Sequence, residues 1–298
     1  MPVVFRPARA EELQRAEELV VRSINDLTER HGLGAMATLR PPQFQLFSLR
    51  DDPDGLWVAE DAGEMVGFSW VCGDLWFLAE LFVSPELQGR GIGHELLKRT
   101  LDHGEKAGAT NTALITFTFN TVSQGLYIRH GLFPRLPLYN FNVAREDLAG
   151  RSQGARLRCE RIESTAAHLH LIGEVDARAL GLSREKHHRY LIDDSEMTGV
   201  MLYDGDDCVG YAYVGANGHV GPLAVAEPDA LDAAFLTALK LAADGGSSHV
   251  SAFLPGSSEK ALSIAAEHGM RITLPMALLS ARDFGDWRQY LPRNPGFM

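Results

Sequence analysis

The stretch "LFVSPELQGRGIGHELL", residues 81–97, constrains the fold most, because it places three glycines within five positions between two segments of different periodicity. The residues before the glycines alternate as in a strand, and the leucines after them recur at helical spacing. Backbone N–H groups at a helix start point outward and the helix dipole adds partial positive charge, so glycines here let an anion approach the main chain. The stretch therefore predicts a strand, an anion-binding turn and a helix, with phosphate as the expected anion.

Two common phosphate-binding motifs do not fit this turn. A dinucleotide fingerprint that begins at Gly91 requires Gly or Ala where the chain has Leu96. A Walker A loop counted from Gly89 requires a glycine and a lysine where the chain has His94 and Glu95. The sequence therefore argues against a Rossmann domain and a P-loop NTPase.

The segments around the turn indicate an α+β domain. Three strand candidates in a row, with short connections, are typical of an antiparallel meander. In chain order we expect a strand at 3–9, a helix carrying Leu13, Ala16, Leu19 and Val20, a helix around 44–49, strands at 56–61, 64–73 and 75–83, the glycine turn, a helix carrying Leu96, Leu97, Thr100 and Leu101, a strand at 112–117, a short helix at 121–131 and a strand at 136–143.

The same order of elements returns in the second half of the chain. Two predicted helices end in His-Gly, at residues 130–131 and 268–269, and both follow matching strands. The periodicity lapses near residues 146–156, where Arg, Gly, Ser and Gln collect as in a linker. A chain of 298 residues is also long enough for about two domains. We therefore predict an internal duplication with domains at residues 1–148 and 155–298.

Composition excludes several classes of protein. The 39 acidic residues outnumber the 28 basic ones in both halves, so neither half resembles a nucleic-acid-binding surface. No apolar run reaches the length of a membrane span, and the N-terminal segment turns polar too early for a secretory signal. The three cysteines are widely spaced, which favours reduced, buried thiols over a disulfide framework. We expect a cytoplasmic protein with neither nucleic acid nor membrane as partner.

The pattern that does fit the turn is Q-x-x-G-x-G, formed by Gln88, Gly91 and Gly93. It resembles the GNAT superfamily of N-acetyltransferases, in which the loop between the fourth strand and the third helix grips the pyrophosphate of acetyl-CoA. The segments "FVSPE" and "NTVSQGLYIRHGLF" also match the family's usual pattern. The resemblance covers residues 3–145, and from 157 to 298 only the order of elements matches. It implies two tandem GNAT-like domains, each a mixed, mostly antiparallel sheet flanked by helices.

The resemblance implies acetyl-CoA as cosubstrate and assigns residues to it. The main chain of Phe82 and Val83 would pair with the pantetheine arm like an added strand, and an amide there would polarise the thioester carbonyl. Asn120 and Ser123 would border the cosubstrate, and the side chain of Arg90 would lie near the phosphates. The amides that would hold the pyrophosphate are those of Gln88, Gly89, Arg90, Gly91, Ile92 and Gly93.

Two residues are candidates for proton transfer. Tyr127 matches the position of the family's frequent general acid, which protonates the departing thiolate. Glu80 is the candidate base, because strict alternation would place it on one face of its strand with Trp76, Leu78 and Phe82, where a carboxylate is costly without a role or a partner. The alternatives are a Glu80 that only pairs with an arginine or faces solvent, and a Tyr127 that only packs its ring.

The second copy lacks features of the first. Residues 228–235 are four positions shorter than the matching residues 85–96, so the phosphate loop is missing. Ala265 stands where the first copy has Tyr127. We expect a degenerate C-terminal domain that packs against the first and shapes the acceptor site or a dimer interface.

The expected reaction is direct acetyl transfer to a primary amine of a small molecule or peptide in a ternary complex. The acidic surface favours a cationic acceptor, and a homodimer is one assembly that the chain allows. No metal is expected, because the histidines at 168, 170, 187 and 188 have no cysteine or carboxylate at ligand spacing. The alternative from another class is a non-catalytic acyl-CoA sensor, and a different acyl donor on the same fold also stays open.

Overall fold

The computed structural model of the chain describes residues 2–72, 75–149 and 157–296. It confirms the expected α+β fold with mixed, mostly antiparallel sheets. Contacts divide the chain into two compact units, each of which is described by itself. The first unit contains Met1–Ile115, Phe119–Phe133 and Ser280–Arg282, and the second contains Thr116–Thr118, Pro134–Leu279 and Asp283–Met298.

In the described residues of the first unit the strands run in the order β1-β2-β3-β4-β5, and they are antiparallel except for the parallel pair β4 and β5. Its elements agree closely with the predicted ones. They are β1 (Val4–Pro7), a 3₁₀ turn (Ala10–Glu12), α1 (Leu13–Arg30), α2 (Gln43–Asp51), β2 (Leu56–Asp61), β3 (Glu64–Cys72), β4 (Trp76–Val83), a 3₁₀ turn (Pro85–Leu87), α3 (Ile92–Lys106), β5 (Thr112–Phe117) and α4 (Thr121–Arg129).

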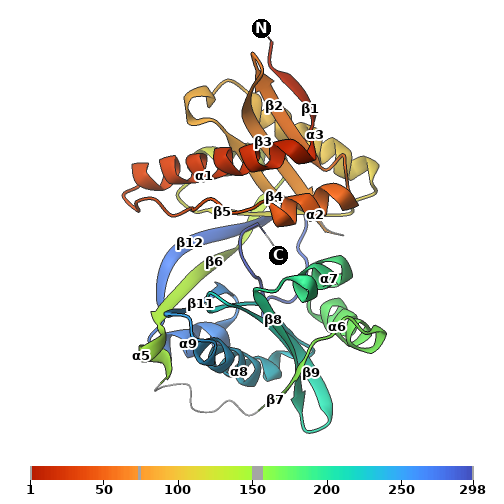
Figure 1. The fold of residues 1–298 in the computed structure, drawn as a ribbon, viewed down its shortest axis with the longest axis vertical. Helices are drawn as coiled ribbons and strands as arrows, with labels where there is room; N and C mark the ends of the chain where they lie inside the picture. Colours follow the sequence, from red (N-terminus) through yellow and green to blue (C-terminus); the bar gives the residue numbers. More distant parts are fainter. Residues whose placement is uncertain (1, 73–74, 150–156, 297–298) are drawn as a thin grey trace. The chain divides into compact units, whose positions relative to one another are not determined.

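Helices cover both faces of this sheet (Figure 1). The predicted apolar stripe of α1 is buried in a cluster that also contains Phe68 and Trp70 of β3 and Phe44 of α2. Ile92 and Leu96 of α3 are buried in a different cluster, with residues of β2 and β3. Since neighbouring strand residues point to opposite faces, α1 and α2 lie on one face of the sheet and α3 lies on the other.

The second unit repeats the sequence of elements. Its strands run in the order β12-β6-β11-β10-β9-β8-β7, with β13 paired to β10. Strands β10 and β11 pair in parallel, whereas β10 with β9, β10 with β13, β11 with β6, β8 with β9 and β7 with β8 pair antiparallel. The elements are β6 (Phe133–Ala144), α5 (Arg145–Ala149), β7 (Arg158–Arg161), α6 (Ala166–Ala179), α7 (Glu185–Asp193), β8 (Met197–Asp204), β9 (Asp207–Gly215), β10 (His219–Val225), a 3₁₀ turn (Pro228–Ala230), α8 (Leu231–Asp244), β11 (His249–Pro255), α9 (Glu259–Glu267), β12 (Arg271–Ser280) and β13 (Tyr290–Leu291).

Strand β6 ends the first sequence copy but pairs with β11 over seven positions, from Leu138 to Ala144. It therefore belongs to the second compact unit, which begins near residue 134. The predicted domains 1–148 and 155–298 mark the sequence repeat and stay a prediction. Of the predicted linker, residues 150–156 lie outside the described part of the chain.

The predicted face of β4 is wrong, because the strand contains a β-bulge. Leu78 lies opposite Val71 of β3, whereas Glu80 lies opposite Trp70, so two steps along β4 correspond to one step along β3. Val71 and Trp70 are neighbours and point to opposite faces, and Leu78 and Glu80 therefore do so as well. Strict alternation had placed them on the same face.

Side-chain contacts agree with this change of face. The indole N–H of Trp76 donates to the carbonyl of Thr100 in α3 (2.9 Å), so Trp76 lies on the α3 face. Phe82 packs in the cluster formed with α1. The bulge thus turns Glu80 and Phe82 toward α1 and α2, while Trp76 and Leu78 face α3.

Some expectations concern features outside the sheets. The prediction that the cysteines are buried is wrong for Cys159, which is exposed, and Cys208 is only partly buried. The side chain of Cys72 lies outside the description. Within the described ranges, no helix combines the length and apolar character that crossing a membrane requires.

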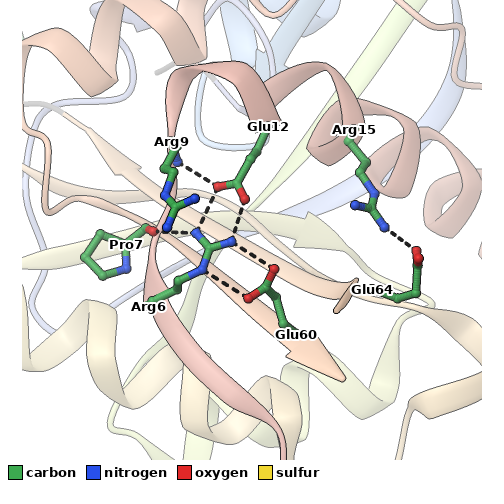
Figure 2. A network of polar contacts seen from close by, with 7 residues as sticks. All are labelled: Arg6, Pro7, Arg9, Glu12, Arg15, Glu60 and Glu64. Atoms are coloured by element: carbon green, nitrogen blue, oxygen red, sulfur yellow. Dashed lines mark hydrogen bonds and ion pairs between the residues drawn. The ribbon is translucent and has the colours of Figure 1, made fainter. Parts of the chain in front are cut away.

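An ion-pair network joins β1, the first turn of the chain and β2 (Figure 2). The guanidinium of Arg6 donates two hydrogen bonds to the carboxylate of Glu60 (3.1 and 2.9 Å) and also binds Glu12. These hydrogen bonds lower the pKa of Glu12 and Glu60 and raise that of Arg6. All three side chains are about three-quarters buried or more, which limits screening by solvent. Nearby, Arg15 pairs with Glu64 in a more exposed position.

We predict that Arg6→Ala lowers the free energy of unfolding at pH 7 by about 1–2 kcal/mol, because two partly buried carboxylates lose their charged partner. The two carboxyl pKa values are lowered in the folded state, so this contribution is present above about pH 4.5 and is lost as pH falls below it. Urea titrations of wild type and variant at pH 7 and pH 3.5 measure the loss of stability and its dependence on pH. Arg15→Ala is the control, with an expected loss below about 0.5 kcal/mol; equal losses in both variants contradict the assignment.

Candidate active site

The glycine turn between β4 and α3 has the conformation that its sequence predicts. Gly89 and Gly91 have φ values of +78° and +83°, in the region that disfavours side chains, and no atom lies within 4 Å of the position that a Cβ would take. Residues 88–91 are exposed, and α3 begins at Ile92 with Gly91 as its N-cap. The glycines are therefore required by the backbone path, and the space above the turn is open.

The main-chain amides of this turn are available. Among the residues that the structure describes, none accepts a hydrogen bond from the amides of residues 88–93. The first such bond in α3 is donated by Glu95 to the carbonyl of Gly91 (3.1 Å). N–H groups at a helix start lack intrahelical partners, and here the preceding turn adds further donors. The arrangement is suited to an anion with several oxygens.

Side chains of the turn serve to hold it. The amide nitrogen of Gln88 donates to the carbonyl of Val83 at the end of β4 (3.1 Å). Arg90 is half exposed and forms an ion pair with Asp61 of β2 (3.6 Å). Ile92 is buried in the α3 cluster. The predicted phosphate contact of Arg90 thus competes with a carboxylate, whereas the main-chain donors have no described competitor.

Strands β4 and β5 part beside this turn. Their parallel register runs from Trp76 to Leu78 and ends there, although β4 continues to Val83. Val83 lies opposite Gly67, and the next amide, of Ser84, donates to β3 (2.8 Å). In an antiparallel ladder this pattern directs the N–H of Val83 away from β3 and that of Phe82 toward it. Of the two predicted main-chain contacts, Val83 faces the opening.

Helix α4 lies next to the same place. Asn120 is the N-cap and accepts a hydrogen bond from the amide of Ser123 (3.2 Å). A Cβ on Gly93 would lie 3.6 Å from Val83 and 3.9 Å from Leu126, so the end of β4, the start of α3 and α4 meet there. The structure therefore brings most of the predicted cosubstrate residues together around one turn.

Tyr127 follows Leu126 in α4 and is buried. Burial raises the pKa of its phenol above the usual value, and a hydrogen bond from the side chain of Ser123 opposes this rise. The phenol therefore stays protonated near neutral pH and can donate a hydrogen bond. Because the pKa is raised, complete proton transfer to a thiolate is less favourable than the ordinary values of a phenol and a thiol suggest.

Glu80 lies on the opposite face of the sheet from α3 and meets α2. Its Oε1 accepts a long hydrogen bond from the side-chain amide of Gln45 (3.4 Å), and the same amide donates to Glu17 of α1 (3.0 Å). Oε2 of Glu80 is buried, and no described group donates to it. Gln45 of α2 thus bridges a carboxylate of helix α1 and a carboxylate of strand β4.

The surrounding protein raises the pKa of both carboxyl groups. Burial, reinforced by the charge of Glu17, raises the pKa of Glu80 to about 8, and the hydrogen bond from Gln45 only partly offsets this. Burial also raises the pKa of Glu17. Glu80 as a whole residue keeps some exposed surface, but its Oε2 atom is buried, so desolvation dominates. A carboxyl group with a pKa near the working pH can both take up and release a proton.

Sequence reasoning missed Glu17 and Gln45. Glu17 directly follows Ala16 of the apolar stripe on α1, so its spacing gives only a weak signal of partial burial. Gln45 is 7% exposed in α2, and a buried glutamine on a short amphipathic helix is the one local sign of a polar role. Their meeting with Glu80 depends on tertiary packing, which periodicity does not report.

The histidines considered as metal ligands have other partners. His188 of α7 bonds Asp176 (2.8 Å) and Tyr213 (3.0 Å) inside a buried polar cluster. His168 contacts Glu160 (3.2 Å). In the described part of the chain, no group of three His, Cys, Asp or Glu side chains has the arrangement of a metal site.

Part of the chain matches a known protein family and a known relative. Residues 21–132 match the profile described as "Acetyltransferase (GNAT) family". An uncharacterized N-acetyltransferase of Archaeoglobus fulgidus is 42% identical over 65 residues, which cover 18% of this chain and 44% of that protein. The match thus spans less than half the length of that relative.

Solved structures resemble the whole chain in fold. A protein from Pyrococcus horikoshii assigned as an acetyltransferase has a TM-score of 0.78 at 16% identity, covering 99% of this chain and 96% of that one. A tandem GNAT protein from the clavulanic acid biosynthesis pathway has a TM-score of 0.64 at 14% identity, covering 94% and 98%. Residues 21–132 thus match the GNAT acetyltransferase profile, and the whole chain shares its fold with proteins that include a tandem GNAT protein.

Proposed function

We propose that the chain transfers an acetyl group from acetyl-CoA directly to a primary amine of a small molecule or peptide, within one ternary complex. The observation that carries the proposal is the set of main-chain donors at residues 88–93, which have no described acceptor and of which residues 88–91 are exposed. A diphosphate offers the several anionic oxygens that such a set of N–H groups binds.

The main chain would position the cosubstrate. Amides of residues 88–93 would bind the diphosphate, and the N–H of Val83 at the opening between β4 and β5 would bind the carbonyl oxygen of the acetyl group as negative charge develops on it. Asn120 and Ser123 would border the arm at the start of α4. Bound acetyl-CoA supplies an activated acetyl thioester, and the residues described here orient it and move protons.

Glu80 would assist deprotonation of the amine, directly or through a water molecule. With a pKa of about 8 it is mostly protonated at neutral pH while the site is empty of cations. An approaching ammonium group favours the ionised form of a nearby carboxyl group, so a cationic acceptor would lower this pKa and Glu17 would add to the attraction. The pair therefore supports a positively charged acceptor over a neutral one.

Tyr127 would act at the leaving group. Its phenol stays protonated, and a hydrogen bond from it to the sulfur would stabilise the departing thiolate. Ser123 lowers the phenol pKa and so would promote proton donation.

Replacing Tyr127 by Phe removes this donor while keeping the buried ring. We expect kcat to fall about 10–100-fold with little change in CoA affinity, because the hydroxyl acts when negative charge develops. Release of free CoA thiol with a panel of primary amines measures this. Tyr203→Phe, on β8 outside the candidate site, is the control and keeps full activity. If CoA binds but no amine releases thiol above hydrolysis, the chain is a sensor and the proposal is wrong.

Glu80→Gln removes the candidate base. For the wild type we expect kcat/KM to rise with pH through an inflection near pH 8, because Glu80 must be deprotonated to accept a proton. The variant loses about 100-fold in kcat/KM and lacks this inflection. Glu64→Gln, an exposed pair partner, keeps the wild-type profile.

The same variant has an effect on stability that needs no substrate. A folded-state pKa raised from 4.5 to about 8 means that ionising Glu80 destabilises the fold progressively as pH rises through this window. Glu80→Gln therefore melts at a higher temperature than wild type at pH 9 and at a similar temperature at pH 5. A variant that melts lower at pH 9 contradicts the buried position of this carboxyl group.

Gly91→Ala tests the anion-binding turn. The added methyl group strains a residue with φ +83° and disturbs the amides, so we expect the Kd for CoA to rise about tenfold or more together with a stability loss of about 1 kcal/mol. Gly108→Ala is the matched control, because Gly108 has φ +82° and equally open surroundings at the other end of α3. It has the same stability cost and unchanged CoA affinity, both measured by thermal unfolding with and without CoA.

A further inference from the structure

The strand that corresponds to β4 in the second unit is β10, and the two have the same surroundings. Val83 of β4 lies opposite Gly67, and Val225 of β10 lies opposite Gly210. In each strand the following residue donates its N–H to the residue before that glycine (2.8 and 2.9 Å). By the same ladder rule, the N–H of Val225 points away from β9, as that of Val83 points away from β3.

Both strands part from their parallel neighbour at the same place. The register of β4 with β5 ends at Leu78, and that of β10 with β11 ends at Val220. Each of these residues precedes the corresponding valine, Val83 or Val225, by five positions. Each strand also carries a bulge just after this point. The second unit therefore builds the same opening that the first unit has beside its glycine turn.

The opening in the second unit contains a segment of the chain itself. Strand β13 pairs with β10 through Leu291 opposite Leu223 and Tyr290 opposite Ala224. The N–H of Val225 donates to the carbonyl of Gln289 (2.9 Å). Because β9 occupies one edge of β10, β13 lies on the edge that faces β11, which it also contacts. The segment supplies a main-chain partner, whereas no described residue accepts a hydrogen bond from the counterpart amide, of Val83.

Side chains and close backbone contacts fix this segment. The side-chain amide of Gln289 donates to the main-chain carbonyls of Val225 (3.2 Å) and Ala226 (2.7 Å). The imidazole of His219, at the start of β10, bonds the carbonyl of Arg293. A Cβ on Gly221 would lie 2.7 Å from the carbonyl oxygen of Pro292, so the segment passes too close for any side chain there. These contacts hold the segment along most of β10.

Tyr290 anchors the segment on the face covered by α6 and α7. The side chain is fully buried, and the guanidinium of Arg184 lies 5.2 Å from the centre of its ring. Trp287, also buried, packs edge-on at 5.9 Å. The hydroxyl of Tyr290 is buried with no hydrogen-bond partner among the described residues. The ring, rather than the hydroxyl, therefore provides the attachment.

We propose that the second copy contains a peptide-binding groove that its own C-terminal segment, residues 286–293, occupies as an added strand, in the position that the pantetheine arm takes in the first copy. The turn after β10 leads directly into α8 at Leu231, so the second copy has no counterpart of residues 88–91, which carry four of the six anion-binding amides in the first copy. The second copy then binds no CoA, and the chain binds one molecule. The stoichiometry rests on the proposed function, whereas the occupied groove does not.

Amide hydrogen exchange on the full chain, with and without CoA, tests the proposal. We expect the amide of Val225 and the segment 286–293 to be protected without CoA and unchanged when CoA is added, and calorimetry to give one CoA per chain. A Val225 amide that exchanges freely without CoA, or that gains protection from CoA, overturns the proposal, as does a stoichiometry of two. If only the expected protection of residues 88–93 by CoA fails to occur, the proposed function is wrong and the groove stands.

Two variants of one residue isolate the anchor. Tyr290→Ala removes the buried ring, and we expect the Val225 amide to exchange about 100-fold faster. Tyr290→Phe keeps the ring and removes only an unpartnered hydroxyl, so protection is retained. If the Ala variant loses protection throughout the unit, Gln289→Ala, which removes no ring, is decisive. It speeds exchange at Val225 alone by about tenfold. Unchanged exchange in Gln289→Ala contradicts the proposal.

Discussion

Main-chain hydrogen bonding at a strand edge organises both halves of this chain. Where β4 leaves β5 after Leu78, and where β10 leaves β11 after Val220, the strand continues without its parallel neighbour. Buried N–H and C=O groups require partners, because an unsatisfied group costs about 1–3 kcal/mol. In the second unit Gln289 provides the partner for Val225. In the first unit Val83 faces the opening next to a turn whose six amides have no described acceptor, and we base the proposed ligand site and the proposed filled groove on this difference.

The bulge in β4 has an energetic consequence. It turns Glu80 away from α3 and toward the helices that supply Gln45 and Glu17. A single amide donor shared by two carboxyl groups cannot compensate for the burial of both charges, so each pKa rises. A solvated glutamate in this position would stabilise the fold better at high pH but would be a much weaker base. The protein thus keeps an electrostatic arrangement that is unfavourable for the fold, and such arrangements are found preferentially at functional sites.

Local features of the fold followed from the sequence, and features set by long-range packing did not. The glycine turn was predictable because Gly89 and Gly91 need positive φ, which is a property of single residues. The helices and the meander followed from apolar spacing. The face of Glu80 was not predictable, because the alternation of residues along a strand does not reveal the extra residue of a β-bulge. The partners of Glu80 come from α1 and α2, far apart in sequence from β4, and no spacing rule connects them.

The C-terminal segment was likewise not predictable from local patterns. It also connects two differences between the copies, the shorter turn after β10 and the added strand β13. The strand β13 has only two residues, too few for any periodic signal. Pro222 occupies the position of Glu80, Ala265 that of Tyr127, and the turn has no counterpart of residues 88–91, so the described part of this copy lacks the groups that we propose bind and activate the cosubstrate in the first. An opening without a ligand would leave the amide of Val225 unsatisfied and an apolar cavity beside it, and both are destabilising. Loss of the binding turn therefore favours a segment that fills the opening, and Gln289 to Leu291 meet both requirements with two main-chain pairs and one buried ring.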